Sequence, residues 1–129
     1  MEFTIRKILP TSDFETTKQN TIEALRMEGF GVLTEIDIQA TLKNKLDRDY
    51  PRFLILGACN PGYADKVLTR NPQISAFLPC NVTIRQLDKY NIEISAVDPL
   101  ALMGGIGIPE IEPFAREVQQ KLQQFIDSL

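Results

Sequence analysis

The sequence contains no histidine and no tryptophan. The absence of histidine excludes Ser-His-Asp and Cys-His nucleophile pairs, histidine-bound zinc and an imidazole general base. Carboxylates and thiols are then the residue types left for proton transfer. On this evidence the sequence does not decide whether the protein is an enzyme, and it names no cofactor.

Cysteine is scarce: the chain has two, Cys59 and Cys80. Their spacing is nothing like Cys-x-x-Cys, so a thioredoxin-type mechanism or a zinc finger has little support. A bridge between them would contribute roughly 3 kcal/mol. In a reducing cytoplasm, however, we do not expect a permanent structural disulfide.

Long apolar runs and a basic excess are also missing. The longest apolar stretch, Phe53 to Cys59, is far shorter than the about 20 residues that span a bilayer. The N-terminus lacks the pattern of a signal peptide, so we expect a cytoplasmic protein with no membrane partner. Net charge is -3 and the basic residues are dispersed, whereas nucleic-acid binders usually carry a continuous positive face. We therefore expect no nucleic-acid partner.

The composition that remains is that of an ordinary globular domain. Hydrophobic residues make up 43% and charged residues 24% of the 129 positions, which fits one soluble domain over residues 1–129.

The first third of the chain predicts two strands and a helix. Residues 2–8 alternate between apolar and polar side chains, as in a half-buried strand. Ser12 with Glu15 forms a capping-box pattern that predicts a helix start, and Gly29 suits the helix end. Residues 31–37 predict the next strand, with Val32, Thr34 and Ile36 on one face and Glu35 and Asp37 on the other.

The rest of the chain predicts further strands between helices. Asp37 is placed to cap a short helix through about Leu46. Residues 53–58 are apolar on both faces, which predicts a central strand covered on each side. Asn60 is placed to cap a helix that begins at Pro61. Residues 80–85 and 92–96 predict a hairpin, and residues 110–128 predict a final amphipathic helix.

The predicted order is therefore strand, helix, four strands with short helical insertions, and helix. This order favours an α+β two-layer sandwich, in which an antiparallel sheet carries two main helices on one face. The other face of the sheet then needs a cover. A second copy of the chain is one way to supply it.

Four short segments resemble the motifs of a known family. They are residues 33–37 (Leu-Thr-Glu-Ile-Asp), residues 56–61 (Leu-Gly-Ala-Cys-Asn-Pro), residues 78–82 (Leu-Pro-Cys-Asn-Val) and Asp98-Pro99. In this order they resemble the bacterial and archaeal family called domain of unknown function 302. The resemblance implies a TATA-binding-protein-like fold and a homodimer, and it implies no activity. A fold shared with a DNA-binding protein is not evidence of DNA binding.

The candidate site is built around the two Cys-Asn steps. Cys59 comes just before the predicted helix start, where free N–H groups favour a reactive thiolate or hold an anion. It fits a buried small hydrophobic residue equally well. Cys80 is in phase with Val82 and Ile84, so packing is its simplest role. If the two thiols meet, they can form a redox disulfide or bind a soft metal.

Other residues complete the candidate set. Asn60 and Asn81 follow the cysteines and are candidate ligand contacts, with capping and edge hydrogen bonds as the alternatives. Glu35 and Asp37 are candidate acid or base groups if they are buried together. Met103 offers a third sulfur for a Cu(I) site.

The leading functional hypothesis is a binding module that holds a small ligand or an anion near Cys59, Asn60 and Cys80. A thiol-based redox enzyme or sensor is the first alternative, with Cys59 and Cys80 as its catalytic candidates. A soft-metal protein and a purely structural or assembly domain are the others. All four depend on whether folding brings the two cysteines to one place.

Overall fold

The computed structural model describes residues 2–104 and 106–129. Its elements, in chain order, are β1 (Thr4–Leu9), α1 (Phe14–Met27), β2 (Gly31–Asp37), α2 (Ile38–Leu46), β3 (Phe53–Cys59), α3 (Pro61–Arg70), the 3₁₀ helix η1 (Pro72–Phe77), β4 (Cys80–Gln86), β5 (Ile92–Val97), α4 (Pro99–Gly104) and α5 (Glu112–Asp127). The predicted order of strands and long helices is confirmed. The sequence patterns missed η1.

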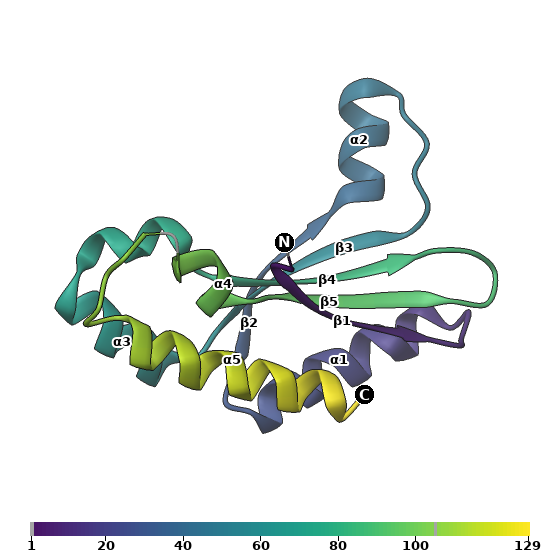
Figure 1. The fold of residues 1–129 in the computed structure, drawn as a ribbon. Helices are drawn as coiled ribbons and strands as arrows, with labels where there is room; N and C mark the ends of the chain where they lie inside the picture. The colour runs from purple at the N-terminus through teal and green to yellow at the C-terminus, as the bar shows by residue number, and fades with distance from the viewer. Residues whose placement is uncertain (1, 105) are drawn as a thin grey trace.

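The five strands form one antiparallel sheet in the order β1-β5-β4-β3-β2. The two long helices, α1 and α5, lie on the same face of this sheet, below it in Figure 1. Alternate residues of the strands point into the layer between sheet and helices. Leu56, Ile84 and Ile94 from the sheet are fully buried there with Leu25 of α1 and Phe125 of α5. The structure is the predicted two-layer α+β sandwich.

The other face of the sheet is not covered by the two long helices (Figure 1). Phe53, Ile55 and Val97 are half-buried on it, while Ile8 is 54% and Ile36 46% exposed. The prediction that residues 53–58 form a strand covered on each side is therefore wrong in one respect. β3 has a neighbouring strand on both edges, but the long helices cover only one of its faces.

Two local predictions about caps and faces are corrected. The cap of α1 is Asp13, whose carboxylate accepts from the backbone N–H of Thr16 at 3.0 Å and from the Thr16 hydroxyl at 2.8 Å. Ser12 lies one residue too early to do this. In β2 the register shifts between Val32 and Thr34. Val32 therefore packs toward the helices opposite Ala58, and it does not share a face with Thr34 and Ile36.

In the part of the chain that the structure describes, no helix is both long and apolar enough to cross a membrane.

Candidate functional site

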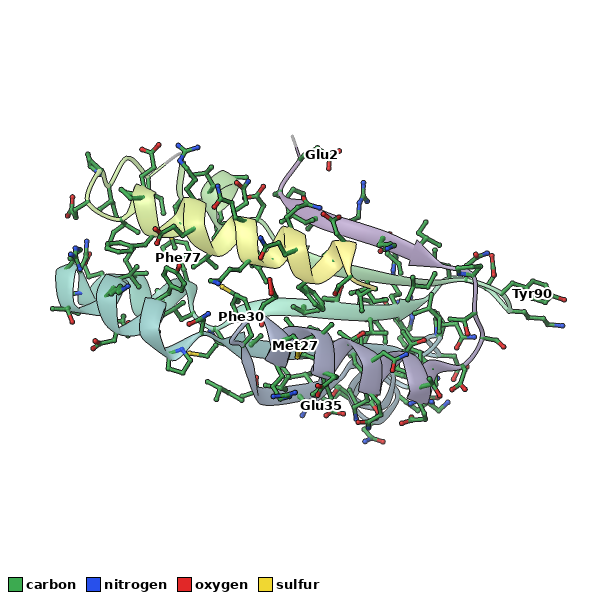
Figure 2. All side chains as sticks on the ribbon, turned by 90° about the horizontal axis from the view of Figure 1, so that it is seen from below. Glu2, Met27, Phe30, Glu35, Phe77 and Tyr90 are labelled. Carbon is green, nitrogen blue, oxygen red and sulfur yellow. The ribbon has the colours of Figure 1, made fainter. Side chains whose placement is uncertain are left out.

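The two cysteines lie at one end of the sheet, where β3 runs into α3 and β4 begins. In Figure 2, Tyr90 in the β4–β5 turn marks one end of the molecule, and Phe77, just before β4, is labelled toward the other. In the β3–β4 ladder Ala58 pairs with Cys80. Cys59 is thus the chain neighbour of the residue that faces Cys80. Antiparallel pairing brings the backbone close together at two cysteines that are far apart in the sequence.

Both cysteines line a single cavity of about 40 Å³, together with Asn60 and Met103. A buried water needs roughly 10–15 Å³, so the space is large enough for a small guest. The remaining wall is mostly apolar and comes from the β3 end, the α1–β2 turn, helices α3, α4 and α5, and the residue before α5. It includes Phe30, Ala58, Val67, Ile111, Phe114 and Val118.

The cavity lies where two groups of buried side chains meet. One group is the core between the sheet and the helices, against which Cys80 packs. The other is a smaller cluster of Val67, Ile74 and Ile111, against which Met103 packs. Both groups contribute residues to the cavity wall. Small side chains at the boundary leave the space unfilled, among them Ala58 and the two cysteines.

Burial controls the protonation of Cys80. Removal of its thiol from water raises the pKa of Cys80 to about 11, and the nearby Cys59 adds to the rise. At neutral pH, therefore, Cys80 is a neutral thiol. Among the described residues both cysteines are free, and each is only partly exposed.

Asn60 occupies the capping position of α3, but its side chain forms no capping hydrogen bond with the described residues. The prediction of a side-chain cap is therefore wrong. Its amide Nδ2 instead donates to the Glu28 carbonyl oxygen at 3.3 Å. The α1–β2 turn comes close enough for this because Gly29 has no side chain: a Cβ there would lie 3.0 Å from Nδ2. Asn60 thus joins two loops beside the cavity.

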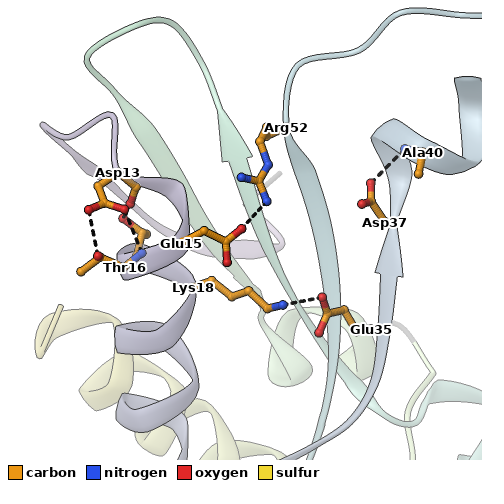
Figure 3. A network of polar contacts seen from close by, with 9 residues as sticks. Asp13, Glu15, Thr16, Lys18, Glu35, Asp37, Ala40 and Arg52 are labelled. Carbon is orange, nitrogen blue, oxygen red and sulfur yellow. Dashed lines mark hydrogen bonds and ion pairs between the residues drawn. The ribbon is translucent and has the colours of Figure 1, made fainter.

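The structure does not bring Asn81, Glu35 and Asp37 to this cavity. Asn81 pairs with Gly57 and is exposed on the sheet face away from α1 and α5. The Glu35 carboxylate lies 2.6 Å from the Lys18 ammonium, and Asp37 accepts from the Ala40 backbone N–H at 2.9 Å (Figure 3). Asp37 therefore caps α2, as its position before the helix predicted. Glu35 and Asp37 form no buried acid–base pair, since both are exposed.

The sequence patterns missed much of the cavity wall, including Tyr63, Val67 and Phe114. These residues lie on the two helices predicted to begin at Pro61 and near residue 110, but the sequence does not show which residues face them. α3 packs against α5, and the Arg70 guanidinium lies 4.6 Å above the Phe114 ring between them. Burial, with the nearby Glu117 carboxylate, raises the pKa of the Tyr63 hydroxyl at the same junction. The signal in the sequence that could have pointed to this wall is the spacing of Tyr63 and Val67, four residues apart on one face of α3.

Possible metal ligands at the cavity are sulfur atoms. Among the described residues no group of three or more His, Cys, Asp or Glu side chains is placed to hold a metal ion. Cys59 and Cys80 are only two residues of these types. The Met103 side chain is a thioether, which binds soft metals only.

This fold and this cavity define a small two-layer α+β domain with a mostly apolar pocket at one end of its sheet. Residues 6–129 match the family described as "Domain of unknown function DUF302", and the chain belongs to this family. A similar solved structure is the crystal structure of an uncharacterized conserved protein DUF302 from Bacillus stearothermophilus. It has 28% sequence identity and a TM-score of 0.89, and the match covers 98% of each chain. The comparison with curated proteins found no match.

Proposed function

We propose that this domain is a binding module that holds a small, weakly hydrated ligand in the cavity beside Cys59, Asn60 and Cys80. The observation that carries the proposal is the cavity itself, which is about 40 Å³ in volume and lined mostly by apolar side chains. Apolar cavities in proteins take up small apolar guests. Pockets with a few polar groups in an apolar wall are the usual ligand sites of proteins.

An anion fits this cavity less well than a weakly hydrated ligand. An anion that leaves water needs charged or hydrogen-bonding partners to replace its hydration. The polar groups at hand are the Asn60 amide, which already donates to the Glu28 carbonyl, and the Cys80 thiol, whose pKa of about 11 keeps it neutral. The N-terminus of α3 alone does not offset the loss of hydration.

A redox enzyme or sensor that uses both thiols receives less support. Thiol–disulfide exchange needs a thiolate as the attacking group. Burial keeps Cys80 protonated, so it is poorly suited to resolve an oxidised Cys59.

The test is a titration of the metal-free protein with dimethyl sulfide, a neutral probe of three heavy atoms, followed by backbone NMR shifts. Phosphate serves as the anionic comparison. We expect dimethyl sulfide to shift residues around the cavity, and phosphate to leave them unchanged.

Two variants in which leucine replaces an alanine supply the matched comparison. Ala64→Leu adds bulk to the cavity wall and is expected to abolish the shifts. Ala40→Leu makes the same change at an exposed position of α2 and is expected to leave them intact. If both probes leave the cavity residues of the wild-type protein unshifted, the proposal is wrong.

We also propose that two copies of the chain associate through the sheet face that carries Phe53, Ile55, Val97, Ile8 and Ile36. Apolar side chains gathered on one face are typical of protein interfaces. The charges of this face are already balanced, since Arg85 pairs with Glu93 at 3.0 Å and Arg6 with Glu2 at 3.9 Å. Contact between two identical faces therefore brings together no net charge of one sign.

The short helix α2 supports the same partner. All nine of its residues keep part of their surface exposed. They include Leu46, which is apolar and 66% exposed. A helix of this length is marginal in water unless something packs against it. In Figure 1, α2 stands above the sheet, on the side away from α1 and α5, where a second copy can cover it.

A further inference from the structure

We infer that the guest of this cavity is an unbranched aliphatic alcohol, and that Met103 rotates to let the chain extend into a second cavity between α4 and α5. The inference rests on the proposed function, because it uses the same cavity and names the class of ligand. It follows from the wall that the two cavities share and from the flexibility of methionine.

The second cavity is about 30 Å³ in volume and adjoins the first. Its wall comes from α4, from the loop that follows it and from α5, and it consists of Leu100, Met103, Gly104, Gly107, Ile108, Glu112 and Ala115. Met103 and Ala115 also line the cavity of about 40 Å³ beside the cysteines. The two spaces therefore lie on either side of these two residues. We call the cavity beside the cysteines the inner cavity and the second one the outer cavity, since Gly104, Gly107 and Glu112 in its wall are exposed.

Met103 is the movable part of the shared wall. Ala115 is buried on α5 and contributes a single methyl group. The Met103 side chain is unbranched and has three rotatable bonds, so it adapts its shape at low cost. It is only partly buried and packs at the margin of the cluster of Val67, Ile74 and Ile111. Rotation of this one side chain is therefore the smallest change that joins the two cavities.

The walls select the chemistry of the guest. The inner cavity is mostly apolar and takes the aliphatic end, while a passage the width of one side chain favours an unbranched chain. The outer cavity has Leu100 and Ile108 beside the Glu112 carboxylate, which accepts from the Arg116 guanidinium at 3.0 Å. A carboxylate accepts further hydrogen bonds and repels negative charge. The outer end of the guest is therefore a hydroxyl group that donates to Glu112, and not a carboxylate.

The experiment is an NMR titration with the straight-chain alcohols from ethanol to hexanol. Each added methylene is expected to raise the affinity about fourfold for as long as the chain is buried. Hexanol is expected to give intermolecular NOEs both to Val67 of the inner cavity and to Ile108 of the outer cavity. Ethanol is expected to give them to Val67 only, and hexanoate to bind more weakly than hexanol.

Two substitutions of Met103 separate the size of the side chain from its flexibility. Met103→Ala opens the shared wall and is expected to raise the affinity for hexanol more than that for ethanol. Met103→Ile keeps an apolar side chain of similar size, but branching at Cβ makes it stiff. In that variant the affinity is expected to stop rising at a shorter chain. Met27→Ile, at a 69% exposed position of α1, is the matched control and is expected to keep the wild-type series.

The outcomes separate this inference from the proposed function. Hexanol that contacts only one of Val67 and Ile108 in the wild-type protein would overturn the inference without any variant, so a misfolded Met103→Ala protein does not weaken the test. Equal affinity series in wild type and Met103→Ile would overturn it as well. A protein that shifts with dimethyl sulfide but does not bind hexanol across both cavities loses only the assignment of the chain. A protein that binds neither probe loses both.

Discussion

Gly57 shows how closely the chain segments approach beside the site. It lies in β3, opposite Asn81 of β4 and Thr34 of β2. A Cβ at this position would collide with the Thr34 hydroxyl and lie 2.8 Å from Cγ of Pro79. The absence of a side chain is therefore what allows Pro79 and Thr34 to pack over the strand, just before Cys80.

We predict that Gly57→Ala lowers the free energy of unfolding by about 1–3 kcal/mol, because the added methyl group overpacks this contact. Gly31→Ala is the matched control in the same sheet: no described atom lies within 4 Å of its added Cβ. That variant is expected to be neutral or more stable by up to about 1 kcal/mol. Urea denaturation measures both, and equal stability of the two variants would contradict the packing argument.

The buried thiol of Cys80 makes stability depend on alkaline pH. Its pKa is raised from 9.0 to about 11 in the folded metal-free protein. In this interval the unfolded chain loses the proton and the folded chain keeps it, so stability falls as pH rises. This contribution to the free energy of unfolding is fully present below pH 9. It is lost as the pH rises from 9 to about 11, and the total loss is about 2–3 kcal/mol.

We predict that Cys80→Ser removes this part of the pH dependence, since serine does not titrate there. Lysines and tyrosines titrate in both proteins, so the difference between the two stability curves isolates Cys80. Cys59→Ser is expected to retain most of the wild-type slope. Parallel curves for wild type and Cys80→Ser would show that the Cys80 thiol is not kept neutral by burial.

At the scale of elements, Asp98 fixes the helix that carries Met103. Its Oδ1 accepts from the backbone N–H groups of Leu100 and Ala101 at 3.0 and 3.1 Å. The same carboxylate accepts from the Gln119 amide of α5, with distances of 3.0 and 2.9 Å. One side chain therefore both caps α4 and ties it to α5 beside the cavity.

We predict that Asp98→Ala lowers the free energy of unfolding by about 1–2 kcal/mol through loss of the cap and the bond to Gln119. Asp98→Asn keeps an acceptor for the helix N–H groups and is expected to cost less. Thermal unfolding followed by circular dichroism compares the two. If alanine and asparagine variants are equally stable, the capping role is wrong.

Most elements could be predicted because their signals are local. Alternation predicted the β4–β5 hairpin, and the apolar spacing along α5 predicted a helix that buries Leu122, Phe125 and Ile126. Asp37 was correctly assigned as a helix cap for the same reason: a cap depends on three residues that follow it. Such patterns need no knowledge of distant partners.

The sequence-based predictions were wrong where a local structure depends on a contact with a residue far away in the chain. The register shift after Val32 accompanies the close packing of Thr34 over Gly57, which belongs to another strand. Asn60 donates to Glu28 instead of capping α3 because the α1–β2 turn lies next to it. Likewise, the sequence singled out Cys59, Cys80 and Met103 as candidates, but it could not show the apolar wall beside them, because the packing of α3 on α5 forms that wall.

At the scale of the whole molecule, the two faces of the sheet differ. One face is buried under α1 and α5, and the other presents Ile8, Ile36 and Ile55 outside the long-helix layer (Figure 1). This difference is the basis of the proposed association of two copies. The apolar side chains left open on this face have a free energy to gain from burial against a partner.

We predict that Ile55→Lys shifts the protein toward monomer, because it places a charge in the middle of the proposed contact. Tyr90→Lys adds the same charge at a 73% exposed position in the β4–β5 turn and is expected to leave the oligomeric state unchanged. Sedimentation equilibrium measures both. A monomeric wild-type protein, or equal dissociation of the two variants, would argue against this interface.

The central claim is that the cavity beside Cys59 and Cys80 is a true binding space for a small, weakly hydrated guest. The most direct measurement is a crystal of the metal-free protein pressurised with xenon. The account predicts one xenon atom between Cys59, Cys80 and Met103, with the surrounding side chains unmoved. A cavity that stays empty under xenon, or that is closed by repacking of its wall, would contradict the claim.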